Sequence, residues 1–234
     1  MKNNGRTVAA ATLFCLAVLL APTLGMAQET EAVDPGETKY APAAEWVRVA
    51  SNDLGYAIVG YRFANQSVGK EWMLLDVGLT IPKGGKNQVL KRDAISISLP
   101  DDTMIPMASQ QDYQADRGKL RGLDATALAA ADNINYFPPS ATYPCRIGFF
   151  TDASQEGRGP AYDQVELSWN GACIGRMYFK IPDGIQYGQH TLNIMFDGGM
   201  LRVPFKIMTN EEMKELKKQI KEMEKEAKQQ KKKE

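Results

Sequence analysis

The sequence predicts an all-β fold, an antiparallel β-sandwich of about eight strands followed by a charged C-terminal α-helix. Three observations support this prediction. Apolar residues alternate with polar ones at a spacing of two, turn-forming residues interrupt the alternation at short intervals, and the chain from residue 209 onward changes abruptly to charged, helix-forming residues. We therefore expect a signal peptide over residues 1–27, a flexible linker over 28–44, a sandwich domain over 45–208 and a helical tail over 209–234.

The first 27 residues have the pattern of a secretory signal peptide. Two basic residues precede an apolar run from Thr7 to Leu20, and Ala27 and Gly25 place small side chains at the first and third positions before a cut. Cleavage after Ala27 would make Gln28 the mature N-terminus. The alternative is an uncleaved anchor, because the run approaches the roughly 20 residues that span a bilayer. We expect export to the periplasm or the extracellular space, with no transmembrane segment once the signal is removed.

The strands are expected where alternation is regular, and turn chemistry separates them. Asn170-Gly171 predicts a hairpin with a type I′ turn, and Asp197-Gly198-Gly199 predicts a second hairpin. In the strand from Glu71 to Ile81, the odd positions are expected to face the core and the even ones a wetter surface. The other strands are expected over Trp46–Val49, Tyr56–Gln66, Ile95–Leu99, Cys145–Phe150, Val165–Trp169, Gly175–Ile181, Leu192–Phe196 and Leu201–Ile207.

Between residues 112 and 139 the alternation lapses. Residues Leu123–Asn133 are rich in alanine and predict one short helix, whereas the prolines in Asn135–Ser140 favour an extended chain. We interpret this segment as a long connection that crosses from one sheet to the other. Long connections on a rigid sandwich often carry binding residues, so a functional role is expected here first.

Two cysteines, Cys145 and Cys173, lie outside the signal peptide. An exported protein normally joins such a pair, and the bridge would stabilise the fold by roughly 3 to 4 kcal/mol on the chain-entropy model. Two free buried thiols are an alternative. A redox-active pair is the other, although these cysteines lack the Cys-x-x-Cys spacing that lowers a thiol pKa.

The composition of the chain excludes several classes of function. Without the two basic residues of the leader and the nine Lys and seven Glu from Glu211 onward, 17 basic residues stand against 21 acidic ones. This balance does not favour nucleic-acid binding. The chain has one histidine, His190, and no Gly-x-Ser-x-Gly motif. We therefore expect no catalytic residues, no metal site and no cofactor, and we interpret His190 as a surface or hydrogen-bonded side chain at a strand entrance.

Four side chains form a candidate binding surface. Trp72 has the opposite register to the core residues of its strand, and Tyr178 shares a strand face with Arg176 and Lys180. Flat aromatic rings with polar neighbours suit sugars or peptides. The alternative is that the long connection covers Trp72 and that Tyr178 is ordinary strand surface.

The tail from residue 209 has a visible helix start. Thr209 and Glu212 have the spacing of a capping box. An apolar seam follows at a 3-4-3-4 spacing: Met213, Leu216, Ile220, Met223 and Ala227. One interpretation is a solvated helix. The other is that the seam docks on a partner helix, such as that of an envelope protein, or on the sandwich itself, while the terminal lysines contact an anionic envelope surface.

Four stretches resemble the immunoglobulin-like domains related to the immunoprotective extracellular antigen family: "EWMLLDVGLTI" at 71–81, "AISISLPDDTMIPM" at 94–107, "GRMYFKIPDGI" at 175–185 and "HTLNIMFDGGMLRVPFKI" at 190–207. The resemblance includes a late Phe-x-x-Pro strand, here Phe179–Pro182. It implies an immunoglobulin-like sandwich and an extracytoplasmic setting, and it transfers no active site. Many relatives are lipoproteins, but this chain lacks their lipid-attachment cysteine.

Three hypotheses of function follow. The first is an exported, non-enzymatic binding or envelope-associated domain. The second is a carbohydrate-binding module, which requires exposed aromatic rings. The third is a hydrolase that uses two carboxylates, which must lie roughly 5 to 10 Å apart in a cleft.

Overall fold

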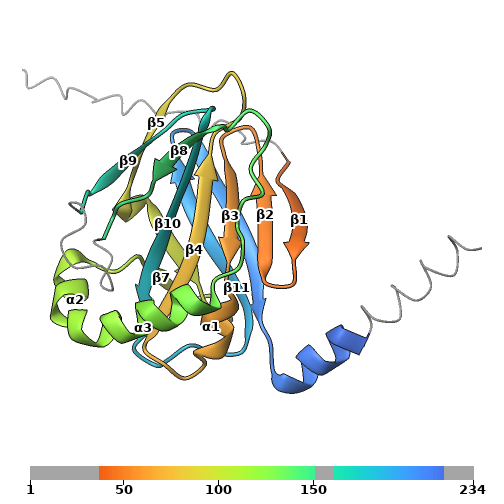
Figure 1. Ribbon diagram of the computed structural model, residues 1–234, viewed down its shortest axis with the longest axis vertical. Helices are drawn as coiled ribbons and strands as arrows, with labels where there is room; N and C mark the ends of the chain where they lie inside the picture. Colours follow the sequence, from red (N-terminus) through yellow and green to blue (C-terminus); the bar gives the residue numbers. More distant parts are fainter. Residues whose placement is uncertain (1–36, 151–160, 219–234) are drawn as a thin grey trace, which may run out of the picture. The chain divides into compact units, whose positions relative to one another are not determined.

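The computed structural model describes residues 37–150 and 161–218, and these ranges form a β-rich fold with antiparallel sheets (Figure 1). The predicted signal cleavage between Ala27 and Gln28 lies outside the described residues. None of the described helices is long and apolar enough to cross a membrane. The strands are β1 (Lys39–Ala44), β2 (Val47–Ser51), β3 (Tyr56–Gly60), β4 (Trp72–Thr80), β5 (Gln88–Lys91), β6 (Ile95–Ser98), β7 (Met104–Pro106), β8 (Tyr143–Arg146), β9 (Gln164–Leu167), β10 (Gly171–Lys180), β11 (Gly188–Phe196) and β12 (Gly199–Ile207).

Two larger sheets share one hydrophobic core. The six-stranded sheet has the order β1-β2-β3-β4-β10-β8, and the four-stranded sheet has the order β12-β11-β6-β7. Strands β5 and β9 form a separate ribbon. All the pairings are antiparallel except that of β8, which runs parallel to β10. Apolar side chains from both larger sheets, such as Leu75 and Val203, belong to the same core and are fully buried.

The hairpin predicted at Asp197–Gly199 is confirmed, because β11 and β12 pair along their whole length. The hairpin predicted at Asn170-Gly171 is wrong. A turn does lie there, closed by a hydrogen bond from the Gly171 amide to the Ser168 carbonyl. However, β9 before the turn pairs with β5, whereas β10 after it pairs with β4 and β8. A local turn signal cannot specify which strands pair, because pairing depends on which apolar faces meet.

Two other predicted segments also differ. The expected strand over Tyr56–Gln66 ends at Gly60, and the helix α1 (Arg62–Gln66) follows it. Residues 39–44 belong to β1, which pairs with β2, so the predicted linker over 28–44 is wrong for this part. The linker prediction failed because Pro42 and the small residues around it lack clear alternation. Residues 28–36 are outside the described ranges.

The long connection forms two helices and an extended segment, and it crosses between the two larger sheets as predicted. The two helices of the connection are α2 (Gln110–Ala115) and α3 (Arg117–Ala130). A 3-10 turn, η1 (Arg92–Ala94), lies outside the connection, just before β6. The all-β prediction is therefore too strict. Helix α2 begins at Ser109, whose hydroxyl accepts a hydrogen bond from the Asp112 amide at 3.0 Å. Helix α3 buries Leu120, Asp124 and Ala127, which are spaced to lie on one helix face.

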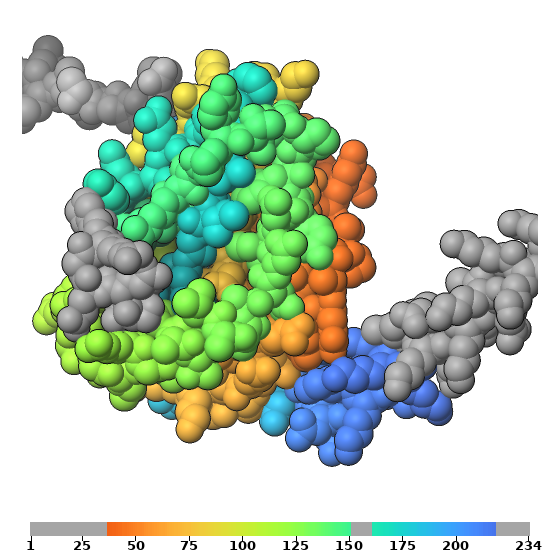
Figure 2. Space-filling model, in the orientation of Figure 1, coloured from red at the N-terminus to blue at the C-terminus, as the bar shows by residue number. Residues whose placement is uncertain are grey.

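Helix α3 and residues 131–139 cover the outer face of the six-stranded sheet, the face opposite the shared core. Figure 2 shows the green connection lying across this face, with β10 in teal visible between its parts. Ile134 packs against Val47, Val49 and Ile58 in a second, small apolar cluster. As a result β4 is buried on both faces, with Asp76 its one partly exposed residue. The prediction that the even positions of this strand face a wetter surface is therefore wrong, because the long connection excludes water from that face.

The tail begins as a helix at residue 210. The predicted capping box is confirmed, since the Thr209 amide donates to the Glu212 carboxylate at 3.0 Å and the Glu212 amide donates to the Thr209 hydroxyl at 3.2 Å. Met213 and Leu216, the first two seam residues, pack against the core of the protein's own domain. The other three seam residues, Ile220, Met223 and Ala227, lie outside the described residues.

Candidate functional site

The candidate binding surface predicted from Trp72, Arg176, Tyr178 and Lys180 is not an open surface. Trp72 is 1% exposed and Tyr178 is 3% exposed. The four residues do share one face of the β4–β10 pair, as their register indicates. That face is covered by α3, so the alternative is right that the long connection covers Trp72 and wrong that Tyr178 is ordinary strand surface, since Tyr178 is buried as well. Sequence alternation correctly predicted that these side chains point to the side of their strands opposite the shared core. It carried no information about which part of the chain covers that side.

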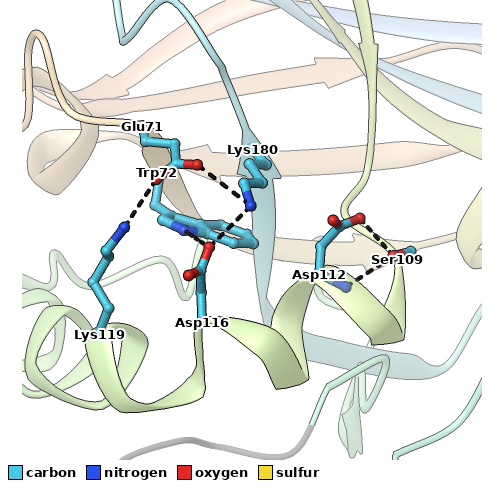
Figure 3. A network of polar contacts seen from close by, with 7 residues as sticks. All are labelled: Glu71, Trp72, Ser109, Asp112, Asp116, Lys119 and Lys180. Atoms are coloured by element: carbon cyan, nitrogen blue, oxygen red, sulfur yellow. Dashed lines mark hydrogen bonds and ion pairs between the residues drawn. The ribbon is translucent and has the colours of Figure 1, made fainter.

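The part of this face beneath α2 and α3 is held by a network of polar contacts, which we call the closed half (Figure 3). The Trp72 indole N–H donates to Asp116 Oδ2 at 3.1 Å, and Lys180 Nζ donates to the same oxygen at 3.0 Å. Glu71 lies 2.9 Å from Lys119 Nζ and 3.3 Å from Lys180 Nζ. Every charge in this network has an opposite charge within contact distance, so the closed half fastens the helix to the sheet.

The electrostatics of the closed half follow from these contacts. The hydrogen bond from Lys119 is the main reason that the pKa of Glu71 lies below its ordinary value. The hydrogen bond from Lys180 likewise lowers the pKa of Asp116, with a smaller effect from Trp72. Both carboxylates are therefore ionised well into the acid range and keep their partners.

A buried ion-pair cluster lies at the centre of the face. Arg176 Nη1 contacts Asp124 Oδ1 at 3.1 Å, while Nε and Nη2 both contact Asp76 Oδ1 at 2.9 Å. The Tyr178 hydroxyl donates to Asp124 Oδ1 at 2.8 Å. Asp124 is completely buried. Burial, followed by the charge of Asp124, raises the pKa of Tyr178, so that its hydroxyl stays protonated and remains a donor.

Beyond this cluster, α3 ends at Ala130 and the outer face opens into a cavity of about 360 Å³. We call this the open half. Asp76, Arg176 and Ile174 from the β4–β10 pair form its floor. Its walls come from the end of α3, from residues 131–134 and from the chain after β8, and they include Leu128, Ile134 and Phe150. Leu128 and Ile174 are 56% and 40% exposed, which is unusual for large apolar side chains at a concave site.

Asp76 is the least satisfied polar group of the floor. Its contacts with Arg176 both fall on Oδ1, and within residues 37–150 and 161–218 no group donates to Oδ2. Burial is the main reason that the pKa of Asp76 is raised above its ordinary value, and Arg176 partly opposes the shift. Asp76 is therefore a partly buried carboxylate at the cavity, and one of its oxygens has no partner in the described part of the chain.

Two further charged residues line the cavity. Asp132 is held by Arg62, whose Nε and Nη2 contact its two oxygens at 3.0 and 2.6 Å. Arg146 extends from β8, the edge strand, which is bonded to β10 by the disulfide between Cys145 and Cys173. The predicted disulfide is thus confirmed, and it anchors one wall of the cavity to the floor.

The sequence carried one signal of this site that pattern analysis missed. A Cβ atom at Gly78 would lie 2.8 Å from the ring of Phe137, and one at Gly60 would lie 3.0 Å from Ile134. Glycine at these two outward-facing positions lets residues 134–137 lie directly on the sheet. Two glycines on the same face of neighbouring strands indicate that another segment of the chain approaches closely.

His190 lies away from this site, and it is fully buried rather than at the surface. Its Nδ1 is 3.1 Å from the Gly188 carbonyl oxygen, as a hydrogen-bonded side chain requires, and its ring stacks on Phe205 with centroids 5.6 Å apart. Burial lowers the pKa of His190, so that the ring is neutral near pH 7. We assign it to the core.

The open half offers hydrogen-bonding groups and apolar walls, the combination typical of a small-molecule site. In the described part of the chain, no three His, Cys, Asp or Glu side chains are close enough together to hold a metal ion. Comparison of the sequence with models of protein families and with curated proteins, and of the chain with solved structures, gives no match.

Proposed function

We propose that this protein is an exported, non-enzymatic binding domain that takes a small ligand into the cavity of the open half. One observation carries the proposal: Asp76 lines a cavity of about 360 Å³ beside apolar walls, and its Oδ2 has no hydrogen-bond donor within residues 37–150 and 161–218. The Asp76 side chain is 20% exposed, so this oxygen can accept a hydrogen bond from water or from a ligand in the cavity. In the closed half the described contacts of Asp116 also fall on one oxygen, Oδ2, but Asp116 does not line this cavity.

Export is supported by the signal-peptide pattern of residues 1–27 and by the disulfide, which is compatible with an oxidising compartment. The immunoglobulin-like resemblance remains part of the proposal, because it implies a sandwich fold and an extracytoplasmic setting. The structure has two sheets around one core, as such a domain requires, together with helices α2 and α3 on one face.

A hydrolase is the second candidate, and one observation favours it. Two carboxylates, Asp76 and Asp132, line the same cavity, and a carboxyl group with a raised pKa suits a general acid. However, both oxygens of Asp132 are already bound by Arg62. A carboxylate held in this way is a poor base or nucleophile, so we rank binding above hydrolysis.

Ligand titration of the mature protein, followed by NMR of its backbone amides, tests the proposal. We expect saturable shifts of Asp76, Ile174 and Ile134 with at least one class of small molecule, and no conversion of that molecule during prolonged incubation. Conversion to a product would favour the hydrolase instead. If a library of sugars, amines, amino acids and organic acids gives no saturable shift at the cavity, the proposal is wrong.

The envelope-associated part of the proposal rests on the sequence after Lys218, which contains six lysines, three of them at 231–233. Truncation after Lys218 retains Met213 and Leu216, which pack against the core. We expect this variant to fold normally but to lose salt-sensitive binding to vesicles that contain anionic phospholipid. Equal binding of the truncated and full-length proteins at low salt would exclude a role for the tail in attachment.

A further inference from the structure

The floor of the open half presents a donor and an acceptor side by side. A guanidinium group has five N–H donors. The contacts of Arg176 with Asp76 and Asp124 use Nε, one N–H of Nη2 and the N–H groups of Nη1, which also lies 3.4 Å from the Asp124 carbonyl oxygen. Within the described residues, Nη2 has no contact besides that with Asp76 Oδ1, so one of its N–H groups remains available next to the Asp76 carboxylate, whose Oδ2 has no described contact either. A hydroxyl group is the simplest partner for such a pair, because it can donate to the carboxylate and accept from the guanidinium.

The charges around the cavity favour a ligand without net charge. Two acidic and two basic residues line it: Asp76, Asp132, Arg146 and Arg176. An ammonium group at Asp76 would lie against the Arg176 guanidinium, and a carboxylate at Arg176 would lie against Asp76. Either charge would meet a like charge in a partly desolvated site, where such repulsion is strong. A hydroxyl group satisfies both residues without this cost.

The walls indicate the rest of the ligand. Leu128 and Ile174 expose apolar surface at the cavity, and Ile134 and Phe150 contribute buried apolar surface. These side chains suit the C–H faces of a ring or chain whose hydroxyl groups point to the floor. A saccharide or cyclic polyol has both features.

From this arrangement we infer that the cavity binds a neutral, hydroxyl-bearing ligand, a saccharide or polyol, with adjacent hydroxyls on Asp76 Oδ2 and Arg176 Nη2. The inference rests on the proposed binding function and specifies its ligand class. It differs from sugar recognition by an exposed aromatic row, because Trp72 and Tyr178 are covered.

The test uses matched sets of small molecules on the mature, full-length protein. Glucose, galactose, mannose and inositol are compared with glucosamine, galactosamine and mannosamine and with glucuronate, galacturonate and mannuronate, by calorimetry and by NMR shifts of Asp76 and Ile174. We expect at least one neutral compound to bind, and its charged counterparts to bind at least tenfold more weakly. Asp76→Asn, which keeps the size but removes the charged acceptor, should weaken that binding at least tenfold.

Two further variants guard against effects on folding. Asp183→Ala removes an exposed carboxylate between β10 and β11 and should bind as the wild type does. Leu128→Ala removes exposed apolar surface from the wall and should weaken binding while retaining the thermal unfolding temperature. Unchanged affinity in both Asp76→Asn and Leu128→Ala would overturn the inference.

The outcomes separate the inference from the proposed function. If amines or acids bind at the cavity more tightly than the neutral compounds, the ligand class is wrong but the binding function stands. If no compound of any class shifts the cavity amides, the binding function fails as well.

Discussion

The closed and open halves of the outer sheet face are built on the same two strands, β4 and β10, yet only the polar groups of the open half line the cavity. In the closed half, the carboxylates of Glu71 and Asp116 each contact lysine, and the ring of Trp72 is buried beneath α3. In the open half, Asp76 lines the cavity and has one carboxylate oxygen that no described residue contacts. The difference arises where α3 ends, at Ala130.

This comparison separates polar groups that stabilise the fold from polar groups available for binding. Both halves contain partly buried carboxylates, such as Asp116 and Asp76, so partial burial alone does not identify a site. What distinguishes the open half is an incomplete set of partners beside a cavity. Variants that affect one half and spare the other test whether the distinction is real.

The largest effect is expected from Asp124→Ala, at the boundary between the halves. Removing this fully buried carboxylate leaves the Tyr178 hydroxyl without its acceptor and leaves Arg176 only the main-chain carbonyl of residue 124 on α3. We expect a loss of about 3–5 kcal/mol in the free energy of unfolding, measured by denaturant titration. Asp76→Ala, at a partly open carboxylate, should cost less. The distinction between the halves fails if the order is reversed.

The disulfide should have the next largest effect, because it attaches the β8 wall of the open half. Replacing Cys145 and Cys173 by Ser should lower the free energy of unfolding by roughly 3 to 4 kcal/mol, since the cross-link closes a loop of 28 residues in sequence separation. Chemical unfolding of the oxidised, reduced and doubly substituted proteins measures the loss. Ligand affinity should fall at the same time, whereas the Trp72 environment, followed by its fluorescence, should not change in the folded protein. A change at Trp72 would show that the halves are not independent.

A smaller effect is expected from Trp72→Phe in the closed half. Phenylalanine keeps most of the buried surface but cannot donate to Asp116 Oδ2. We expect a loss of about 1 kcal/mol in the free energy of unfolding, with no change in affinity at the cavity. Thr209→Ala, which removes a helix cap of similar strength far from both halves, provides the control. Weakened ligand binding in Trp72→Phe alone would connect the closed half to the site.

Leu128→Ser should change stability by less than about 0.5 kcal/mol, because this side chain is 56% exposed. Its effect should fall on the open half alone, as weaker binding of the ligand. Thermal unfolding and calorimetric titration of the same sample give both quantities. If Leu128→Ser has the affinity and the stability of the wild type, Leu128 does not contribute to ligand binding.

The final prediction concerns pH and needs no substitution. The pKa of Asp76 is raised by burial, whereas the pKa values of Glu71 and Asp116 are lowered by their lysines. The charged neighbours of Asp76 are Arg176, Asp124 and Asp132, and Arg146 lines the same cavity. As pH falls, Asp76 should take up its proton first, and affinity for a hydroxyl ligand should fall with it. The stability contributions have opposite signs: that of Asp76 is lost as pH rises through its raised pKa, and those of Glu71 and Asp116 are lost as pH falls through their lowered pKa values. Carboxyl ¹³C titration by NMR should give Asp76 a pKa above the ordinary value of an aspartate and Asp116 a pKa below it.

Much of the fold was predictable because strand alternation and turn residues are local signals. The β11–β12 hairpin, the capping box at Thr209, the disulfide and the shared face of Arg176, Tyr178 and Lys180 on β10 all follow from short-range pattern or from residue count. The helix α3 was predicted in part, since Ala-rich residues favour a helix whatever surrounds them.

The site itself was decided by tertiary structure. Alternation placed Asp76 and Arg176 on outward faces, but it could not show that their strands pair, that Asp124 of α3 reaches the same guanidinium, or that α3 stops short of the cavity. The turn at Asn170-Gly171 illustrates the same limit, because β9 and β10 flank it and yet join different sheets. Strand alternation, the helix cap, the turns and the disulfide could be predicted from the sequence, because each depends on neighbours within a few positions or on the chemistry of the residues alone. Which strands pair and what covers each face depend on how apolar surfaces far apart in the chain are buried together, and only the folded structure decides that.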